Sequence, residues 1–361
     1  MATVGGVAGR VPATPQAESI GKPPLPRRAA DFFRRNEEHA WRGVARVAVL
    51  LPLAALVFAV SVLAVKAWPA IRVNGWYFLY GRNWTYGQGY GAVVHTDGVA
   101  HPMGSQFGAW AILWGTLVSS LIAIVIALPL SIGAAFALTE RMPGWISRPL
   151  GFAIEILAGI PSVVIGLWGI LTFAPWLAKN VYPIIADHAP NVPVLRYFRN
   201  PVSAEGLLSA GIVLALMIVP IITSTTRDLF LQVPPLPKEG ASALGMTDWE
   251  VASRVTVPWV RSGIIGATVL GIGRALGETI AVVMIGGSVL RIPINIYQPF
   301  TTVAATILSQ LDGAFTDGTG FAVATLAELA LVLAVISVAV NLIARLIITR
   351  TGRIGAPVGG A

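Results

Sequence analysis

The sequence contains no cysteine and little charge. Only 12% of the 361 residues are charged, whereas soluble domains carry about 25%, so a chain that folds entirely in water is excluded. The missing cysteine excludes disulfides, thiolate metal sites and a cysteine nucleophile. The four histidines do not have the HExxH spacing of zinc hydrolases. We therefore predict no catalytic residues and no metal site.

Apolar residues are abundant and clustered. They make up 55% of the chain, and the mean hydropathy is +0.74. A helix needs about 20 apolar residues to cross the hydrocarbon core of a bilayer, at roughly 1.5 Å per residue, and six runs satisfy this. We predict an all-α, polytopic membrane protein with six transmembrane helices. They are expected near residues 44–68, 110–138, 150–177, 206–226, 263–290 and 321–348.

The basic residues indicate how these helices are oriented. Cytoplasmic connections of membrane proteins are enriched in Lys and Arg. The two termini and the connections on their side of the membrane hold 17 of the 25 basic residues, and the opposite side holds 7. We therefore expect cytoplasmic N- and C-termini. The predicted divisions are a disordered tail at 1–43, rich in Gly, Pro and Ala near its start, an extracytoplasmic loop at 69–108, a helical core at 109–349 and a short tail at 350–361.

The connection at residues 234–258 is too structured for a simple turn. Its prolines end the preceding helix, a short helix is expected from Lys238, and Gly245 is placed to end that helix. Thr247 and Glu250 have the spacing of a capping box, which starts a second short helix. Two short helices at an angle would form a projecting knob that docks on a partner protein. The alternative is a linker lying flat on the lipid headgroups, but the segment lacks the broad apolar stripe of an interfacial helix.

The spacing within this knob resembles a known motif. Glu239-Gly240-Ala241, then Gly245 and, nine residues later, Val255-Thr-Val-Pro, resembles the EAA loop of ABC-importer permeases. The resemblance implies a type I, MetI-like permease fold and a loop that inserts into an ATPase subunit. It further implies coupling roles for Glu239, Gly240, Ala241 and Gly245, and we add the neighbouring Thr247 and Glu250.

The chain has no nucleotide-binding motif of its own. The only Gly-Lys pair, at residues 21–22, is followed by proline and is not part of a GxxxxGK[ST] sequence. We therefore expect no cofactor on this chain, with ATP and Mg²⁺ bound by a partner ATPase. On this interpretation the chain is not an enzyme.

Four ionisable residues fall inside the predicted spans: Glu155, Arg274, Glu278 and Glu328. Each costs about 2.5–3.5 kcal/mol at a helix centre and is by default a functional candidate, so we predict that all four belong to the substrate pathway. Arg274 and Glu278 are four residues apart and share a helix face. A self-neutralising pair is the alternative for these two. For Glu155 and Glu328, a structural hydrogen bond to a neighbouring helix explains the residue equally well.

The sequence around these charges resembles one branch of the importers. GRALGETIAV at 273–282 and EILAGIPSVVIGLWG at 155–169 resemble the permeases of phosphate ABC importers, the Pst systems, and within them the C subunit. The resemblance implies a bacterial plasma (inner) membrane location. Its implied partners are a homologous PstA-like permease, two PstB-like ATPase subunits, a PstS-like extracytoplasmic phosphate-binding protein and the lipid bilayer, with no nucleic acid.

Three other functions are considered beside phosphate import. A sulfate or molybdate permease would share the EAA loop, although such permeases usually differ at the positions of Gly277-Glu278-Thr279. A proton-coupled secondary transporter would use the buried carboxylates without an ATPase, and the EAA-like loop argues against it. An intramembrane enzyme would need a constellation such as paired aspartates, but every Asp lies outside the spans or at their ends.

The two glycines Gly273 and Gly277 also predict a close helix contact beside Arg274.

Overall fold

The computed structural model describes residues 27–87, 92–188 and 203–351. Residues 1–26 and 352–361, which include most of the two predicted tails, lie outside this range. The chain divides into two compact units, Met1–Phe58 and Ala59–Ala361. In the first unit the described residues form the beginning of helix α1, Arg27–Asn74. Its apolar side chains, among them Leu50, Leu53 and Phe58, are exposed, as expected for a helix surrounded by lipid.

The start of α1 differs from the sequence prediction. Residues 27–43 were expected to belong to a disordered tail, whereas the helix already begins at Arg27. The reason is local, because this stretch contains no proline and only one glycine, and is dominated by helix-compatible Ala, Arg and Glu residues.

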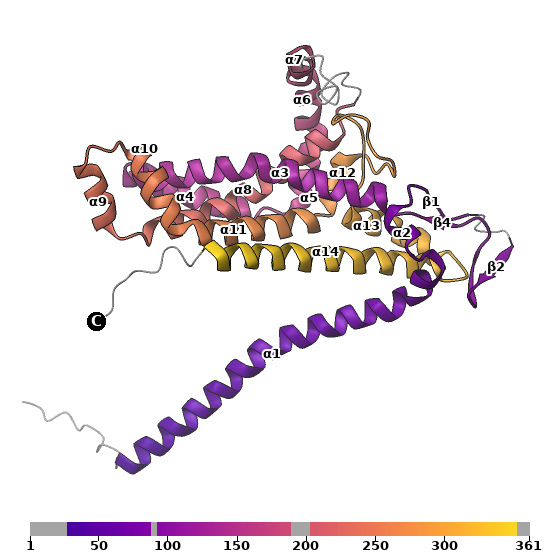
Figure 1. Cartoon of the computed structure of the whole chain (residues 1–361), viewed down its shortest axis with the longest axis horizontal. Coiled ribbons are helices and arrows are strands. Elements are labelled where there is room, and N and C mark those ends of the chain that lie inside the picture. Colours follow the sequence, from indigo (N-terminus) through magenta and orange to yellow (C-terminus); the bar gives the residue numbers. More distant parts are fainter. Residues whose placement is uncertain (1–26, 88–91, 189–202, 352–361) are drawn as a thin grey trace, which may run out of the picture. The chain divides into compact units, whose positions relative to one another are not determined.

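The second unit contains the end of α1 and all other elements (Figure 1). Its remaining helices are α2 (Tyr77–Tyr80), α3 (Trp110–Phe136), α4 (Gly144–Ala158), α5 (Ser162–Trp168), α6 (Ala174–Asn180), α7 (Tyr182–His188), α8 (Leu207–Leu231), α9 (Pro235–Ala243), α10 (Asp248–Val251), α11 (Val257–Gly277), α12 (Ile280–Gly286), α13 (Val303–Phe315) and α14 (Phe321–Thr351). Short π-helical turns at Ala137–Arg141, Gly169–Phe173 and Ala252–Thr256 continue α3, join α5 to α6, and join α10 to α11.

Six helical segments within the described ranges are long and apolar enough to cross a membrane, which confirms the predicted number. They are Val44–Asn74, Trp110–Arg141, Ser162–His188, Leu207–Leu231, Asp248–Gly277 and Phe321–Arg350. The third and fifth differ from the prediction. The run at 150–177 is interrupted between Gly159 and Pro161, where α4 ends and α5 begins, because proline cannot donate the backbone hydrogen bond that a continuous helix needs.

The fifth predicted span is also interrupted. Its apolar run continues to Leu290 in the sequence, but α11 ends at Gly277 and Glu278 adopts an extended conformation, with φ −69° and ψ 127°. The chain becomes helical again in α12, which ends at Gly286 and is followed by Gly287 with a φ of +79°. At its N-terminal end, the fifth span is longer than predicted, because α10, the π-helical turn and α11 follow one another without a gap from Asp248 to Gly277.

The core of the second unit surrounds α8. This helix packs against α3, α4, α11 and α12, and its Ile218 and Ile222 are fully buried. Close approach of α11 to α8 depends on Gly271, because a Cβ atom at this position would lie 2.8 Å from Cδ1 of Ile222. Small residues at such crossings are typical of membrane helix packing. The core therefore holds α11 tightly along its middle.

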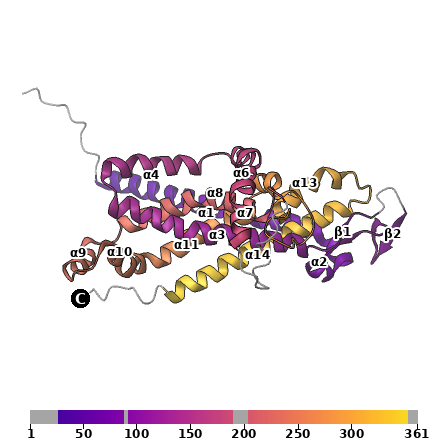
Figure 2. The ribbon, with the colours of Figure 1, turned by 90° about the horizontal axis from the view of Figure 1, so that it is seen from above.

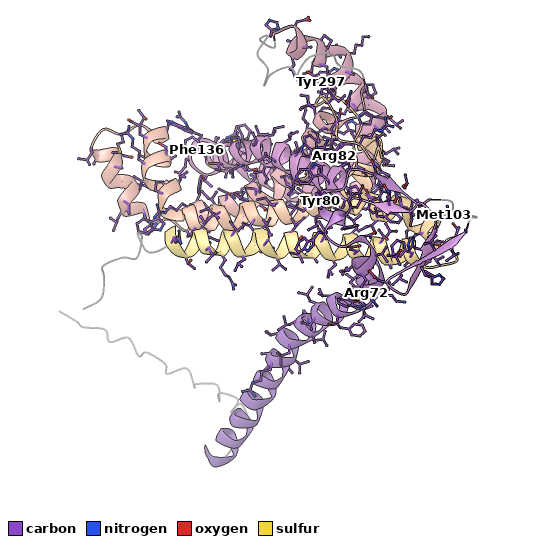
Figure 3. All side chains as sticks on the ribbon, turned by 45° about the vertical axis from the view of Figure 1, so that its right-hand side comes forward. Arg72, Tyr80, Arg82, Met103, Phe136 and Tyr297 are labelled. Carbon is purple, nitrogen blue, oxygen red and sulfur yellow. The ribbon has the colours of Figure 1, made fainter. Side chains whose placement is uncertain are left out.

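The two ends of this bundle carry different structures. Figures 1 and 2 both place α9 and α10 at one end of α11, and the short strands at the other. Strand β1 (Trp84–Thr85) pairs with β4 (Gln106–Phe107), and β2 (Val93–Thr96) pairs with β3 (Val99–Pro102), both antiparallel. In Figure 3, Met103 marks the end with the strands and Phe136 the end with α9 and α10. Within the segment predicted as a loop at 69–108, α2 and these four strands form the structure that we call the cap.

A side chain of α13 holds this cap to the bundle. The Oε1 atom of Gln310 accepts hydrogen bonds from Nε1 of Trp84, at 2.8 Å, and from the hydroxyl of Tyr86, at 2.5 Å. Trp84 and Phe107 also meet edge to face, with ring centroids 5.0 Å apart. Burial raises the pKa of the Tyr86 hydroxyl, and this effect is larger than the lowering effect of the side-chain hydrogen bond with Trp84. The cap is therefore a packed structure with a defined position on α13.

Candidate functional site

The first half of the 234–258 knob is a helix with a complete C-terminal cap. Helix α9 begins at Pro235, three residues earlier than predicted, and ends at Ala243. Gly245 has a φ of +84°, its N–H donates to the carbonyl of Ser242, and the N–H of Met246 donates to the carbonyl of Ala241. These two hydrogen bonds form a Schellman motif, which confirms Gly245 as the residue that ends the helix.

The second half begins with the predicted capping box. The backbone N–H of Glu250 donates to Oγ1 of Thr247 at 3.4 Å, and Oε2 of Glu250 accepts from the backbone N–H of Thr247 at 3.0 Å. This reciprocal pair satisfies two backbone donors at the start of α10. Thr247 and Glu250 therefore shape the knob, and their predicted part in coupling remains a prediction.

The knob presents backbone at its surface. Glu239, Gly240 and Gly245 are exposed, and a Cβ atom at Gly240 would find no atom within 4 Å. Ala241 differs, because it is 7% exposed and faces the protein. Of the residues predicted to meet a partner, Glu239, Gly240 and Gly245 are therefore available, whereas Ala241 packs α9 onto its own chain.

Contacts from the end of α3 hold the knob, and sequence reasoning missed them. Nζ of Lys238 lies 2.6 Å from Oε1 of Glu140, and Nη1 of Arg141 lies 3.0 Å from Oδ2 of Asp248. The rings of Phe136 and Trp249 add an edge-to-face contact at 5.7 Å. The paired residues are about a hundred positions apart in sequence, so no local pattern identifies them. One short π-helical turn thus contacts both α9 and α10.

Arg274 and Glu278 form an ion pair at the break between α11 and α12. Nη2 of Arg274 is 3.8 Å from Oε2 of Glu278, and the two side chains are 40% and 5% exposed. The prediction of one continuous helix beneath this pair was wrong, because Arg274 lies in the last turn of α11 and Glu278 follows its end. The carboxylate also caps the next helix, since its Oε1 accepts from the backbone N–H of Ala281 at 3.4 Å.

The glycines beside this pair do not make the predicted helix contact. A Cβ atom at Gly273 or Gly277 would meet nothing within 4 Å among the described residues, so that prediction was wrong within this chain. The close approach occurs instead at Gly271, against α8. The open space beside Gly273 and Gly277 leaves the face of α11 near Arg274 uncovered in the chain alone.

Glu155 lies in a different place from the Arg274 pair. It belongs to α4, is 55% exposed, and its Oε1 is 3.3 Å from Nη1 of Arg227 on α8. The guanidinium of Arg227 also fills the space above Gly151, where a Cβ atom would lie 2.9 Å from Nη1. Sequence reasoning did not identify Arg227 as the partner, and the ion pair satisfies Glu155 without a substrate.

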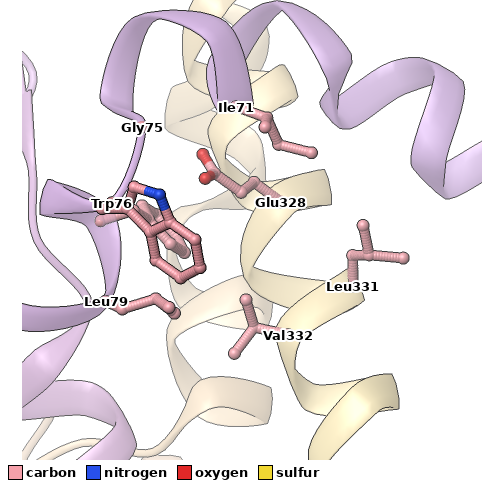
Figure 4. Close-up of a pocket in the computed structure, with 8 residues that line it drawn as sticks. Ile71, Gly75, Trp76, Leu79, Glu328, Leu331 and Val332 are labelled. Carbon is pink, nitrogen blue, oxygen red and sulfur yellow. The ribbon is translucent and has the colours of Figure 1, made fainter.

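Glu328 lies in a third place, on α14 against the end of α1. Its side chain is buried, and Oε2 accepts a hydrogen bond from Nδ2 of Asn74 at 2.9 Å. Figure 4 shows its carboxyl group directed toward the segment of Gly75 and Trp76. The structure therefore brings together only Arg274 and Glu278 of the four predicted pathway residues.

A further acidic residue was not singled out from the sequence. Asp317 precedes α14 and accepts hydrogen bonds from the backbone N–H groups of Thr319 and Ala322, both at 2.9 Å. Burial alone would raise the pKa of this carboxyl, but these backbone donors and the Thr319 hydroxyl hold it below its usual value. Asp317 thus fixes the start of α14. Among the residues that the structure describes, no group of three or more His, Asp or Glu side chains is suited to hold a metal ion.

Six membrane-crossing helices, a structured knob at one end and an ion pair at a helix break are features of a multi-pass transport subunit. The family of binding-protein-dependent transport system inner membrane components matches residues 127–353, so the chain is a multi-pass inner membrane permease subunit with the MetI-like fold. The phosphate transport system permease protein PstC 1 of Mycobacterium tuberculosis is 53% identical over 334 residues, which is 92% of this chain and 98% of that protein. The PstC protein of Haemophilus influenzae is 39% identical over 303 residues, covering 84% and 89% of the two chains. The chain belongs to the PstC family of ABC-transporter permeases.

Among solved structures, a chain of the inward-facing MetNI methionine ABC transporter matches 68% of this chain and 94% of its own length. That match has 18% identity and a TM-score of 0.46.

Proposed function

We propose that this chain is the membrane permease subunit of an ATP-driven importer of inorganic phosphate. The observation that carries the proposal is the 53% identity to a phosphate transport permease over nearly its whole length. The ion pair at the helix break supports it, because it places a cationic fork and a carboxylate side by side in a span-forming region. The translocation path would run between this chain and a homologous permease, past Arg274 and Glu278.

The chemistry of this pair suits hydrogen phosphate. A guanidinium group binds two oxygens of an oxyanion in one plane, and Arg274 is 40% exposed. Phosphate near neutral pH keeps at least one proton, so a P–OH group can donate a hydrogen bond to the Glu278 carboxylate, whereas sulfate has no O–H to donate. The 3.8 Å separation of Arg274 and Glu278 exceeds a hydrogen-bond distance, so both groups keep donors and acceptors for a substrate. The roles predicted for Glu155 and Glu328 in the path remain predictions.

The energy for transport would come from partner subunits. In this proposal the exposed surface of Glu239, Gly240 and Gly245 docks on one of two ATPase subunits, which bind ATP and Mg²⁺ and perform the hydrolysis. A phosphate-binding protein would deliver the ion to the cap at the opposite end. Rocking of the two permeases about a site near the middle of the membrane then alternates access. The charge asymmetry of the connections supports a cytoplasmic position for the knob and both termini.

The test measures uptake of labelled phosphate at low micromolar concentration, with excess sulfate as competitor, in cells that lack this chain. The cells carry the intact gene, a Gly240→Trp variant or a Gly144→Trp variant. Both glycines are exposed and a Cβ atom at either would meet nothing within 4 Å, so both positions have room for a side chain to begin. Only Gly240 lies on the proposed docking surface.

The intact gene and Gly144→Trp are expected to restore uptake that resists sulfate, and Gly240→Trp is not, at equal amounts of protein in the membrane. Uptake abolished by sulfate or molybdate would assign the importer to another anion. Full rescue by Gly240→Trp would exclude this surface as the ATPase contact. Uptake that persists without any ATPase would point to a proton-coupled carrier instead.

A further inference from the structure

A cavity of about 410 Å³ lies between the end of α1 and the first half of α14 (Figure 4). It is separate from the Arg274 pair and from the knob. Most of its surface is apolar, and its one acidic residue is Glu328. The lining residues are Ile71, Gly75, Trp76, Phe78, Leu79, Glu328, Leu331 and Val332.

The carboxyl group in this cavity is short of positive charge. Glu328 is 5% exposed, and its carboxyl group accepts a hydrogen bond from the neutral amide of Asn74 at 2.9 Å. Among the described residues no Lys, Arg or His forms an ion pair with it. A buried carboxylate without a cation is costly, so the cavity favours a ligand that brings a positive charge within reach of Glu328.

The surface beyond the cavity favours a ligand with a long alkyl chain. The residues that are three, four, seven, ten and fourteen positions after Glu328 lie along one face of α14. All are apolar, and three of them remain strongly exposed, at 62% for Val335, 65% for Val338 and 56% for Leu342. The stripe continues Leu331 and Val332 of the cavity wall. A single carboxyl group, that of Glu328, therefore lies at one end of an exposed apolar track on α14.

The depth of the cavity matches a lipid headgroup region. Glu328 is seven residues from the start of α14, about 10 Å along the helix at 1.5 Å per residue. This is the end of the bundle that carries the strands (Figure 1). Trp76, at the rim, is 81% exposed, and exposed tryptophans are typical of the boundary between membrane and water. With the proposed orientation, this boundary belongs to the outer leaflet.

We propose that this cavity binds a phospholipid with a primary ammonium headgroup. The ammonium would donate to the Glu328 carboxylate beside the Trp76 indole, whose ring face attracts cations, and an acyl chain would follow the stripe on α14. The apolar track favours a lipid over a small soluble amine, which would leave Val335, Val338 and Leu342 unused. The inference goes beyond the transported ion and does not depend on the identity of that ion.

The test uses the assembled importer containing the full chain, stripped of lipid in detergent. Phosphatidylethanolamine, its N-acetylated derivative and phosphatidylglycerol are added one at a time, and bound lipid is counted by native mass spectrometry. The wild-type protein is expected to retain phosphatidylethanolamine about tenfold better than the two lipids without an ammonium group, as a charge-assisted hydrogen bond predicts.

Two variants make the assignment specific. Glu328→Gln keeps a carbonyl oxygen for the Asn74 amide but removes the charge, and it is expected to lose the tenfold preference. Glu155→Gln is the matched control, because Glu155 is also a carboxylate in a helix but is paired with Arg227 on another surface, and it is expected to keep the preference.

Equal retention of the three lipids by the wild-type protein would overturn the proposal, even if no variant could be purified. A Glu328→Gln protein as selective as wild type would also overturn it. Displacement of bound phosphatidylethanolamine by millimolar ethanolamine would assign the cavity to a soluble amine instead. Because none of these readouts involves phosphate uptake, failure here would leave the proposed transport function untouched.

Discussion

Glu278 and Glu328 are two buried carboxyl groups with opposite surroundings. They are 6% and 5% exposed, and both lie on or beside helices that cross the membrane. Glu278 has a guanidinium group 3.8 Å away, whereas Glu328 has the amide of Asn74. Equal burial of the same chemical group therefore produces two different sites.

The difference shows that the neighbouring group determines which charge a buried carboxylate site favours in its ligand. Beside Arg274, the carboxylate is compensated, and the pair offers both a cation and an acceptor to an anion that carries a proton. Beside Asn74, the carboxylate is uncompensated, so its site favours a cation. Burial alone identifies a functional candidate in a membrane protein, and the charge of the partner predicts the sign of the ligand.

The largest effect is expected from removing the cation of the first site. Arg274→Gln leaves the buried Glu278 carboxylate without a cation, which destabilises the protein, and it removes the fork that would hold the oxyanion. Phosphate uptake is expected to fall by about a hundredfold or more, and the thermal unfolding midpoint of the purified protein to fall with it.

The double variant Arg274→Gln/Glu278→Gln separates these two roles. It no longer buries an isolated charge, so its unfolding midpoint is expected to recover while uptake stays low. Uptake by Arg274→Gln within about twofold of wild type would show that this pair is structural and that the anion follows another path.

A smaller effect is expected from Glu328→Leu. This change removes the acceptor of the Asn74 amide, and leaving a partly buried donor without a partner costs about 1–3 kcal/mol, of which the loss of the uncompensated carboxylate offsets a part. Glu328→Gln, which retains an acceptor, is expected to change the unfolding midpoint much less. A Glu328→Leu protein at least as stable as wild type would show that Asn74 does not need this acceptor, and would weaken the contrast with Arg274→Gln.

The smallest effects are expected at the knob, where two ion pairs differ in how exposed their side chains are. Lys238 and Glu140 are 21% and 25% exposed at 2.6 Å, whereas Arg141 and Asp248 are 62% and 60% exposed at 3.0 Å. Exposed ion pairs contribute about 0–1 kcal/mol, so Asp248→Asn is expected to leave stability nearly unchanged. Glu140→Gln is expected to lower the unfolding midpoint and the phosphate-stimulated ATP hydrolysis of the assembled importer. Equal effects of the two changes would show that burial does not govern these contacts.

The knob could be predicted from sequence because its determinants are local. A left-handed glycine at residue 245 and a capping box from Thr247 to Glu250 involve residues at most a few positions apart. The number of spans could also be predicted, since it follows from runs of apolar residues.

The break after Gly277 could not be predicted in the same way. The apolar run continues past Glu278 to Leu290, so hydropathy indicates a single helix. The partners of Glu155 and Glu328 were equally inaccessible, because Arg227 and Asn74 are 72 and 254 positions away. Only the packing of α4 on α8, and of α14 against the end of α1, brings these groups together. Sequence identified the charged residues, and tertiary structure determined which of them form one site.

The unbroken helical path from Asp248 to Gly277 has a mechanical consequence. Its 30 residues correspond to about 45 Å at the rise of an α-helix. The knob's second helix is one end of this path, and Arg274 lies in the last turn at the other. Because α11 ends at Gly277 and α12 begins at Ile280, the two helices do not form one rigid rod. We expect a tilt imposed at the knob to move the Arg274 guanidinium relative to Glu278 without dragging α12 with it.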